Sequence, residues 1–504
     1  MKIALIQGRT ACDRPAENLE HITGVLKGKD LNGAALVIFP ALALSGRLGP
    51  EALARPGLDI QYRKVWDDFL ALTVKHPETV FAASALMFDG PEGPAEKAFL
   101  AQAGQAVFGE GGGPATRKVG GLNASVWPGG RTPEGLAAES DLVITLNDQL
   151  FQGRPYFPPE GKPANGYRLN VSTVGGQGPH IYDGATWVIN PKGELKGWAH
   201  GFENTLVILD TDAKNLPTLD PLPLRHDLDT LHQALTAGLR DFCRGTGCDQ
   251  VVLGLSGGLD SAITALLAVD ALGAEKVLGV GMPSEYNAPE SLTLARDLAK
   301  NLGIHFLTIP IDGVREAFTR SFLLTPKTSE KAGHLADENI QARIRGVLLM
   351  YLANREQRLV LATGNKSEAA MGYSTLYGDT CGAIAPIGDV YKARLFELAR
   401  HLNRDGERIP EGIISRPPSA ELRPDQKDSD SLPPYEMLDD ILERHIEGGR
   451  SGSQVAREGG HSAMTVAWVL STLKKSAFKR DQEPFSLVAS TRPLGGFDWP
   501  EKPV

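Results

Sequence analysis

Short apolar runs of strand length recur along the second half of the chain, and a stretch with the helical spacing of apolar residues separates each run from the next. The runs cover residues 251–253, 277–280, 306–309 and 359–362. Strands that alternate with helices in this way predict a doubly wound parallel sheet of the α/β class. Ligands of such sheets bind at the carboxyl ends of the strands.

The first half of the chain also contains strand-like runs, with helix-like stretches and glycine-rich loops between them. These runs cover residues 1–7, 35–39 and 142–146. A proline-rich segment follows, because residues 211–224 read TDAKNLPTLDPLPL and show neither helical nor strand periodicity. That composition is typical of a linker. We therefore predict two domains, residues 1–212 and residues 225–504.

Composition narrows the class of protein. A chain of 504 residues is longer than one ordinary hydrophobic core supports, and its net charge of −9 argues against nonspecific binding to nucleic acid. No run approaches the roughly eighteen apolar residues of a membrane span, and residues 1–7 resemble a strand rather than a signal peptide. We therefore expect a cytoplasmic protein that does not bind membranes. Four cysteines are too few for a disulfide framework, and Cys243 and Cys248 lack the second pair of a zinc site.

The most informative segment is the turn Gly254–Ser261, which reads GLSGGLDS and connects the run 251–253 to a largely apolar stretch. A strand that ends in glycines and continues as a helix directs backbone N–H groups and the positive end of the helix dipole at one point, which favours phosphate. The turn lacks the lysine of the GxxxxGK[ST] loop and carries Asp260, whose carboxylate suits Mg²⁺ beside phosphate oxygens. The alternative is an ordinary strand–turn–helix junction capped by an Asp-Ser pair.

This turn resembles the SGGxDS loop of the ATP pyrophosphatase superfamily, whose members hold the β,γ-pyrophosphate of ATP and release AMP. Further motifs follow along the chain. They are MPS at 282–284, ENIQARIRG at 338–346, TGNKSE at 363–368, GYSTLYGD at 372–379, DVYK at 389–392, PPSAEL at 417–422 and KRDQ at 479–482. In this order they resemble NAD synthetase, the ligase that amidates deamido-NAD (nicotinic acid adenine dinucleotide). The resemblance covers residues 225–485.

The resemblance implies ATP as a substrate, Mg²⁺ as a cofactor and Asp260 and Lys392 as catalytic residues. Asp260 and Glu368 are the implied metal ligands. The residues implied to bind ATP and pyrophosphate are Gly254, Leu255, Ser256, Gly257, Gly258, Leu259, Asp260, Ser261, Thr363 and Lys392. Those implied to bind deamido-NAD are Asn339, Glu368, Asp379 and Lys479. The alternatives are solvated surface charges at the two lysines and a helix cap at Asn339.

The chain departs from the family pattern close to the implied substrate site. Gly388 stands where these enzymes usually carry lysine, and Thr380–Ala383 replaces a more usual Met-x-Gly-Gly. These departures leave open another adenylating amidoligase that acts on a different carboxylate. A noncatalytic pseudoenzyme is disfavoured because the nucleotide motifs are intact.

The first half resembles the nitrilase-type amidase domain, an α-β-β-α sandwich that makes ammonia in glutamine-dependent NAD synthetases. The segments that carry this resemblance are residues 3–7, 38–40, 42–46 and 170–177. Such amidases need a thiolate nucleophile, a glutamate base and a lysine for the oxyanion. Ala41 stands at the position of the base and Asn123 at that of the nucleophile, while the lysine position falls near Phe99, with Lys97 only a neighbour.

These replacements predict a domain that keeps its fold and has lost the glutaminase reaction. The enzyme would then use free ammonia or ammonia from a separate supplier, and the domain would serve as a structural or oligomerisation module or as a dock for that supplier. The alternative is a glutaminase site made by residues that the motifs do not identify; Cys12 is far in sequence from the expected nucleophile. The resemblance also implies a homodimer or higher oligomer through the synthetase domains.

Overall fold

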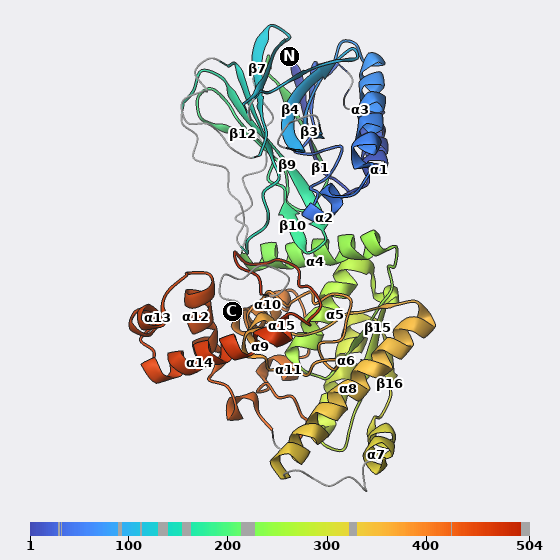
Figure 1. Cartoon of the computed structure of the whole chain (residues 1–504), viewed down its shortest axis with the longest axis vertical. Coiled ribbons are helices and arrows are strands. Elements are labelled where there is room, and N and C mark those ends of the chain that lie inside the picture. The colour runs from blue at the N-terminus through green and yellow to red at the C-terminus, as the bar shows by residue number, and fades with distance from the viewer. Residues whose placement is uncertain are drawn as a thin grey trace. The chain divides into compact units, whose positions relative to one another are not determined.

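The computed structural model describes residues 1–28, 31, 33–88, 93–110, 113–129, 140–153, 163–212, 227–321, 330–424 and 426–494. The chain divides into two compact units, Met1–His226 and Asp227–Val504 (Figure 1). Most of the predicted linker lies outside the described residues. No described helix is long and apolar enough to cross a membrane.

The first unit is built mainly from strands. They are β1 (Lys2–Arg9), β2 (Leu36–Ile38), β3 (Val80–Met87), β4 (Ala95–Gln102), β5 (Gln105–Phe108), β6 (Ala115–Val119), β7 (Leu122–Trp127), β8 (Leu142–Asn147), β9 (Tyr167–Gln177), β10 (His180–Asp183), β11 (Trp187–Ile189), β12 (Leu195–Trp198) and β13 (Thr205–Asp210). The neighbours β3, β2, β1, β9, β8 and β7 run parallel in this order, so their carboxyl ends lie at one edge.

Apolar side chains from the two halves of this strand order pack against each other, which makes two layers of sheet. Ile3 and Leu36 of the first half share one buried cluster with Ile144 and Leu169 of the second. Helices α1 (Pro15–Leu26) and α3 (Leu58–Val74) cover the outer face of the first half, and the short α2 (Pro50–Leu53) precedes α3. Between β6 and β13 the described residues form strands and loops without a helix.

The second unit contains a parallel sheet in the order β16-β15-β14-β17. Its strands are β14 (Val251–Gly254), β15 (Val277–Gly281), β16 (His305–Thr308) and β17 (Leu359–Val360). Each predicted run therefore contributes a strand. The chain proceeds from β14 to β15 and β16 and then returns to β17 on the other side of β14, which places the topological switch point beside the carboxyl end of β14.

Helices surround this sheet and continue beyond it. They are α4 (Asp227–Thr246), α5 (Leu259–Leu272), α6 (Pro289–Leu302), α7 (Asp312–Arg320), α8 (Glu330–Glu356), α9 (Lys366–Met371), α10 (Lys392–Leu402), α11 (Glu411–Ser415), α12 (Tyr435–Ile446), α13 (Gly452–Gly459), α14 (Ala463–Lys475) and α15 (Ala477–Arg480). One face of the sheet, with Val252 and Val280, packs on Ile344 and Leu352 of α8. Helices α9, α12, α13 and α14 share a second apolar cluster.

Candidate functional site

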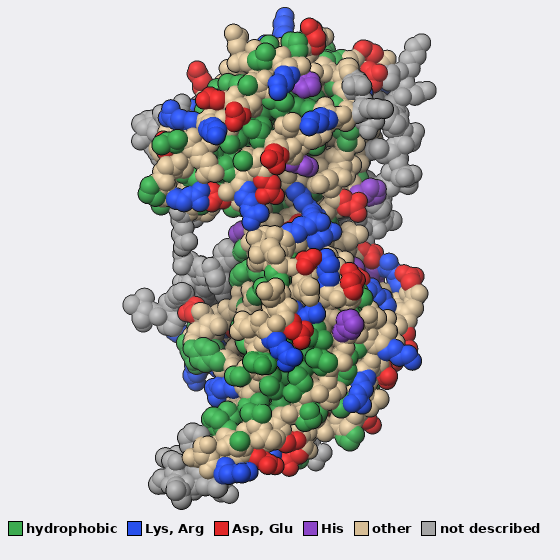
Figure 2. Space-filling view, turned by 90° about the vertical axis from the view of Figure 1, so that its right-hand side faces the viewer, with side chains coloured by type: hydrophobic (Ala, Val, Ile, Leu, Met, Phe, Trp, Pro, Cys, Tyr) green, Lys and Arg blue, Asp and Glu red, His purple; other side chains and the backbone are tan. Residues whose placement is uncertain are grey.

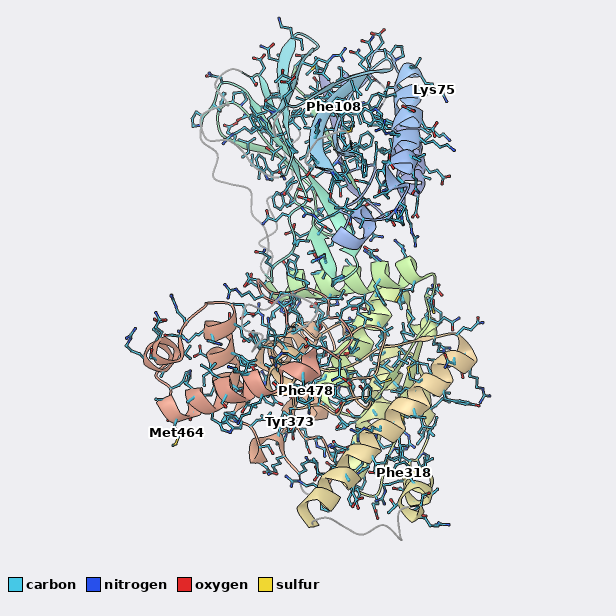
Figure 3. All side chains as sticks on the ribbon, in the orientation of Figure 1. Lys75, Phe108, Phe318, Tyr373, Met464 and Phe478 are labelled. Carbon is cyan, nitrogen blue, oxygen red and sulfur yellow. The ribbon has the colours of Figure 1, made fainter. Side chains whose placement is uncertain are left out.

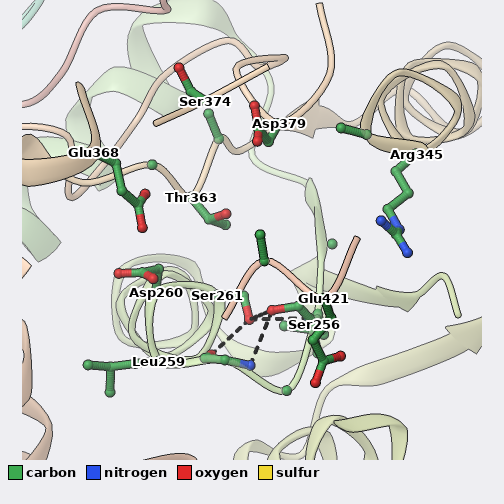
Figure 4. Close-up of a pocket in the computed structure, with 18 of the residues that line it drawn as sticks. Ser256, Leu259, Asp260, Ser261, Arg345, Thr363, Glu368, Ser374, Asp379 and Glu421 are labelled. Atoms are coloured by element: carbon green, nitrogen blue, oxygen red, sulfur yellow. Dashed lines mark hydrogen bonds between the residues drawn. The ribbon is translucent and has the colours of Figure 1, made fainter. Parts of the chain in front are cut away.

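The turn after β14 has the geometry of an anion site. Gly257 has a φ of +80°, and a Cβ atom there would lie 2.3 Å from the carbonyl oxygen of Ser291, so glycine is required. The Ser256 hydroxyl accepts from the backbone N–H of Gly258 at 3.1 Å, and the Ser261 hydroxyl donates to the Gly258 carbonyl at 3.0 Å (Figure 4). These bonds fix the turn directly before the N-terminus of α5.

A buried lysine meets two acids beside this turn. Asp260 lies in the first turn of α5, and Lys392 is the first residue of α10. The Lys392 ammonium group forms an ion pair with Asp260 and lies 3.5 Å from Oε1 of Glu368. The Asn365 side chain donates from Nδ2 to Asp260 at 3.1 Å. The structure thus brings together residues separated by more than 100 positions in sequence.

Glu368 is held by the local fold of α9. Asn365 caps this helix, since its side chain accepts from the Glu368 backbone N–H at 3.0 Å, and the Glu368 side chain accepts from the Asn365 N–H in return. This reciprocal pair is a capping box, so the TGNKSE motif also encodes a helix start. Thr363, at the beginning of the motif, lines the same cavity as Asp260.

Burial and charge shift the acid–base equilibria of this centre. Burial raises the pKa of Glu368 to about 8, and the neighbouring Asp260 carboxylate adds to that shift. Burial alone would lower the pKa of Lys392, but Asp260 and Glu368 together raise it above its ordinary value. Asp428, which the motifs did not indicate, faces the same centre; burial raises its pKa, and the Tyr435 hydroxyl donates to it at 2.9 Å.

The cavity around this centre has a volume of about 530 Å³ and extends past Thr363 to a second polar wall. Asp379 lies there, accepts from the backbone N–H of Thr375 at 2.6 Å and has its pKa raised to about 6 by burial. Glu483, also missed from the sequence, lines this wall and accepts from Ser374 at 3.1 Å. The predicted substrate residues Glu368 and Asp379 therefore both border the cavity.

The other two predicted deamido-NAD residues stand behind the wall. Asn339 and Lys479 are not among the residues that line the cavity. Asn339 accepts from the Thr375 hydroxyl at 2.8 Å, and Lys479 donates from Nζ to the carbonyl oxygens of Gly372 and Ser374 at 2.7 and 2.6 Å. In this structure both residues support the segment that carries Asp379.

Two further residues of the cavity were not singled out from the sequence. Arg345 of α8 is half-buried, and removal of its guanidinium from solvent lowers its pKa; it donates from Nε to the Met282 carbonyl at 3.0 Å (Figure 4). Glu421 accepts from the hydroxyl of Ser291 at 2.7 Å and forms an ion pair with Arg416. Ser291 is the residue whose carbonyl abuts Gly257, so Glu421 reaches the back of the anion-binding turn. Both residues lie within the sequence motifs 338–346 and 417–422, and no other feature of the sequence indicated them.

Gly388 stands against the C-terminal segment. A Cβ atom at this position would lie 2.1 Å from Oγ of Ser486, and Ala385 forms a parallel bridge with Ser486. Glycine at position 388, in place of the usual lysine, therefore allows the segment that carries Ser486 to approach closely. Within the described part of the chain, no three His, Cys, Asp or Glu side chains are grouped so that they alone form a metal site.

The three positions predicted for a glutaminase site in the first unit do not lie together. Ala41 is buried just after β2, at the edge where the parallel strands end. Phe99 is fully buried within β4 and packs on Trp66, with ring centroids 4.9 Å apart. Asn123 lies at the beginning of β7, where its backbone N–H donates to Asp141 at 2.8 Å. Asn123 is therefore at the opposite end of the parallel strands from Ala41.

The fold and the cavity of the second unit define a nucleotide-binding α/β domain of the ATP pyrophosphatase type. Comparison with known proteins gives the family. Residues 231–483 match the NAD synthase family. The chain is 35% identical to the glutamine-dependent NAD(+) synthetase of Aquifex aeolicus, with 92% of each chain covered, and 34% identical to that of Xylella fastidiosa strain Temecula1, with 98% and 97% covered. The chain belongs to the NAD synthase family.

Solved structures confirm the predicted fold class over both units. The glutamine-dependent NAD⁺ synthetase of Acinetobacter baumannii, in complex with ADP, matches with a TM-score of 0.71 and 27% identity over 98% of both chains. The glutamine-dependent enzyme of Cytophaga hutchinsonii matches in fold with a TM-score of 0.80, at 17% identity, over 99% of this chain and 97% of that one. The chain is thus an enzyme, a ligase that forms a carbon–nitrogen bond.

Proposed function

We propose that this enzyme amidates deamido-NAD to NAD through an acyl-adenylate and takes its nitrogen from ammonia supplied in solution or by a partner. A carboxylate does not accept ammonia directly, because its oxygen is a poor leaving group. Attack of the nicotinate carboxylate on the α-phosphorus of ATP releases pyrophosphate and gives an acyl group whose leaving group is AMP. Ammonia then attacks the acyl carbon, AMP departs and one proton is lost.

The observation that carries the synthetase step is the Lys392–Asp260 ion pair beside the glycine turn. The glycine turn and the positive end of α5 favour the pyrophosphate that gains charge as it leaves. Lys392 adds a buried positive charge at the same place. Asn365 orients Asp260 through its side-chain hydrogen bond. Arg345, on the far side of the cavity, offers a second positive charge to the substrate phosphates.

Mg²⁺ is the metal that this centre suits best. Mg²⁺ commonly takes one or two protein carboxylates together with phosphate oxygens, and Asp260 and Glu368 provide such a pair at the cavity wall. When bound, the ion would neutralise charge on the triphosphate. Asp379, with its neighbours Ser374 and Glu483, would contact the deamido-NAD half of the reacting pair.

Use of ammonia rests on the side chains of the first unit. The names of the relatives assign glutamine to them, but Ala41 offers no carboxylate at the strand edge where an amidase base would stand. Cys12 is the one cysteine among the first 242 residues of the sequence. Partial desolvation and the adjacent Asp13 raise the pKa of its thiol, which disfavours the thiolate. The alternative, a glutaminase made by other residues, therefore lacks a cysteine whose pKa favours the thiolate.

The deciding experiment measures NAD and glutamate together. Purified enzyme with deamido-NAD, ATP and Mg²⁺ should form NAD from ammonium chloride and not from glutamine. Glutamate released in step with NAD would show an active glutaminase and refute the ammonia proposal. If NAD forms from neither nitrogen source, the enzyme uses another carboxylate substrate or needs a partner that delivers ammonia. Measuring AMP formation with other carboxylates in place of deamido-NAD separates these two explanations.

We further propose a homo-oligomer through the second unit, acting in the cytoplasm where ATP is available. The exposed fractions of Val347 and Tyr351 on α8 are 67% and 62%, and Met350 beside them is also exposed. Hydrophobic side chains gather on this side of the second unit (Figure 2). Exposed apolar patches of this kind mark protein interfaces. Light scattering should report at least a dimer, and Tyr351→Glu should shift the enzyme towards the monomer.

A further inference from the structure

Arg416 is a cation of the nucleotide cavity to which the steps above give no task. It follows directly after α11 and lines the cavity of the second unit. Among the described residues of that lining, the other lysine and arginine side chains are Arg345 and Lys392. Lys392 is already paired with Asp260. A cavity proposed to hold a triphosphate beside a dinucleotide therefore has Arg416 as one of its few sources of positive charge.

Arg416 lies beside the glycine turn. Its Nη1 donates to the Ser291 hydroxyl at 2.6 Å, and the Ser291 carbonyl oxygen is the atom that leaves no room for a Cβ at Gly257. The pair of Asp260 and Lys392 belongs to the side of the turn where α5 begins. A pyrophosphate held by the turn would thus have Lys392 towards α5 and Arg416 towards Ser291.

Glu421 holds the guanidinium group of Arg416 in place. Nη2 of Arg416 donates to Oε1 of Glu421 at 2.5 Å, and the Asn287 side chain donates to Oε2 at 2.8 Å. The Glu421 backbone has a φ of +48°, in the left-handed region that favours glycine. Such conformations persist where several contacts determine them, and they are common at functional sites. In Figure 4, Ser256 and Ser261 of the turn lie between Asp260 and Glu421.

The guanidinium group keeps donors for a ligand. Arginine carries five N–H groups in a planar fork, and those of Arg416 make two hydrogen bonds to described residues, one to Ser291 and one to Glu421. The side chain is 28% exposed, so a molecule in the cavity can reach it. The fork matches the oxygens of a phosphate, and such charge-assisted bonds are stronger than neutral ones.

From these contacts, and resting on the proposed function, we propose that Arg416 binds the β,γ-pyrophosphate of ATP and that Glu421 is its positioning residue. Arg416 donates to phosphate oxygens from the Ser291 side of the turn. These bonds form with ATP and persist with the pyrophosphate product, because neither bond breaking nor bond making occurs at those oxygens. AMP lacks both phosphates and makes no contact with Arg416.

Calorimetric titrations of the full-length protein with inorganic pyrophosphate and with AMP, both in the presence of Mg²⁺, test this role. Arg416→Met should weaken pyrophosphate binding by about ten-fold or more, the scale of one charge-assisted hydrogen bond, and leave AMP unchanged. Arg416→Lys should lie between, because it keeps the charge and loses the fork. The matched control is Arg423→Met, at an exposed position of the same segment outside the cavity lining, which should bind both probes as the wild type does.

Removal of Arg416 also leaves the Glu421 carboxylate without its cation, and an unpaired negative charge would itself repel pyrophosphate. The double variant Arg416→Met/Glu421→Gln removes both charges and separates the two effects. Its affinity for pyrophosphate should stay as low as that of Arg416→Met, because Glu421 acts through Arg416. Recovery of the wild-type affinity would show that Arg416 only neutralises Glu421 and would overturn the proposal.

Glu421→Gln alone tests the positioning role. It should weaken pyrophosphate less than Arg416→Met does, leave AMP unchanged, and add nothing once residue 416 is methionine. Additive losses in the double variant would show that Glu421 does not act through Arg416, and a parallel loss of AMP would show a general structural role. Either result would refute the positioning role.

Failure of the Arg416 contact and failure of the proposed function give different results. If the wild type binds no pyrophosphate, the pyrophosphate site of the proposed function is refuted, and the Arg416 contact with it. If the wild type and Arg416→Met bind pyrophosphate equally, the contact alone is refuted. If Arg416→Met does not fold by circular dichroism, Arg416→Lys decides: a selective loss of pyrophosphate supports the contact, and unchanged pyrophosphate binding or an equal loss of AMP refutes it.

Discussion

The ammonium group of Lys392, the first residue of α10, is paired with the carboxylate of Asp260 in the first turn of α5, directly after the glycine turn. The pair couples the anion-binding turn to the segment that carries Lys392. Asp260 is therefore not a simple helix cap, which was the alternative that its sequence position left open. Its carboxylate receives the Asn365 amide from one side and the lysine from the other.

Asp260→Asn should abolish conversion of ATP to AMP while the fold persists. The substitution removes a charge that orients Lys392 and completes the carboxylate pair, and loss of one preorganised electrostatic group commonly costs about 10²–10³-fold in rate. The measurement is AMP formation with saturating deamido-NAD and ammonium, with circular dichroism as the check on folding. A folded variant that forms AMP at the wild-type rate would refute the role of this carboxylate.

Glu368→Gln should change how stability depends on pH in nucleotide-free enzyme kept in EDTA. Burial and Asp260 raise the pKa of Glu368 from an ordinary 4.5 to about 8, so its neutral form is the one the fold favours. The stability linked to that proton is fully present below about pH 4.5 and is lost as the pH rises through 8. Glutamine stays neutral throughout.

The free energy of unfolding of the variant should thus exceed that of the wild type by an amount that grows from pH 5 to pH 8 and then levels off. The measurement is the urea midpoint at each pH. The exposed Glu290→Gln on α6 serves as the matched control and should give a constant difference. A flat profile for Glu368→Gln would show that this carboxylate is not held neutral.

Lys366→Met should destabilise the second unit by about 3–5 kcal/mol, the usual cost of removing one partner of a buried ion pair. The Lys366 side chain is fully buried and lies 2.8 Å from Asp389, and it also donates to the Ser490 hydroxyl at 2.7 Å. Urea unfolding of Lys366→Met, Asp389→Asn and the double variant forms the test. The double variant should lose less than the sum of the two single losses, whereas strict additivity would show that the pair is not coupled.

Gly388→Ala should destabilise the same region by about 1–3 kcal/mol, because overpacking a close contact costs that much. The added Cβ would meet Oγ of Ser486 at 2.1 Å and its Cβ at 2.9 Å. Ser486→Gly in the Gly388→Ala background should therefore recover the loss, and Ser486→Ala should recover less. Melting temperatures of the four proteins measure this, and no recovery in the glycine double variant would mean that the strain lies elsewhere.

The local sequence pattern was sufficient to predict the strands of the sheet in the second unit. Each of the runs around Val251, Val277, Phe306 and Leu359 contributes a strand, and the glycine turn joins a strand to a helix, because apolar periodicity and glycine turns are encoded within a few residues. Contacts over long sequence separations were not encoded in that way. Glu421 meets Ser291 across 130 residues, and no periodicity marks either one.

Buried side chains of a residue type that is usually exposed were also not predicted from the sequence. Lysine is rarely fully buried, so no sequence pattern predicted that Lys366 lies inside an ion-pair network. Asn123 was predicted at the nucleophile position from a motif, and a motif does not contain the direction of its strand. Only the parallel pairing of β7 with β8 and of β8 with β9 shows that Asn123 begins a strand at the edge opposite to Ala41.

Cys12→Ser should leave NAD formation from ammonium unchanged, and neither wild type nor variant should release glutamate from glutamine. Cys12 follows the end of β1, at the same edge as Ala41, so it is the thiol that a retained glutaminase would use. Partial desolvation and Asp13 raise the pKa of this thiol, and a nucleophile needs the opposite shift. The measurement is NAD and glutamate from each nitrogen source, with Asn123→Ala as the matched control at the far end of β7. Glutamate release by the wild type that disappears in Cys12→Ser but persists in Asn123→Ala would identify Cys12 as a working nucleophile and overturn the proposed use of free ammonia.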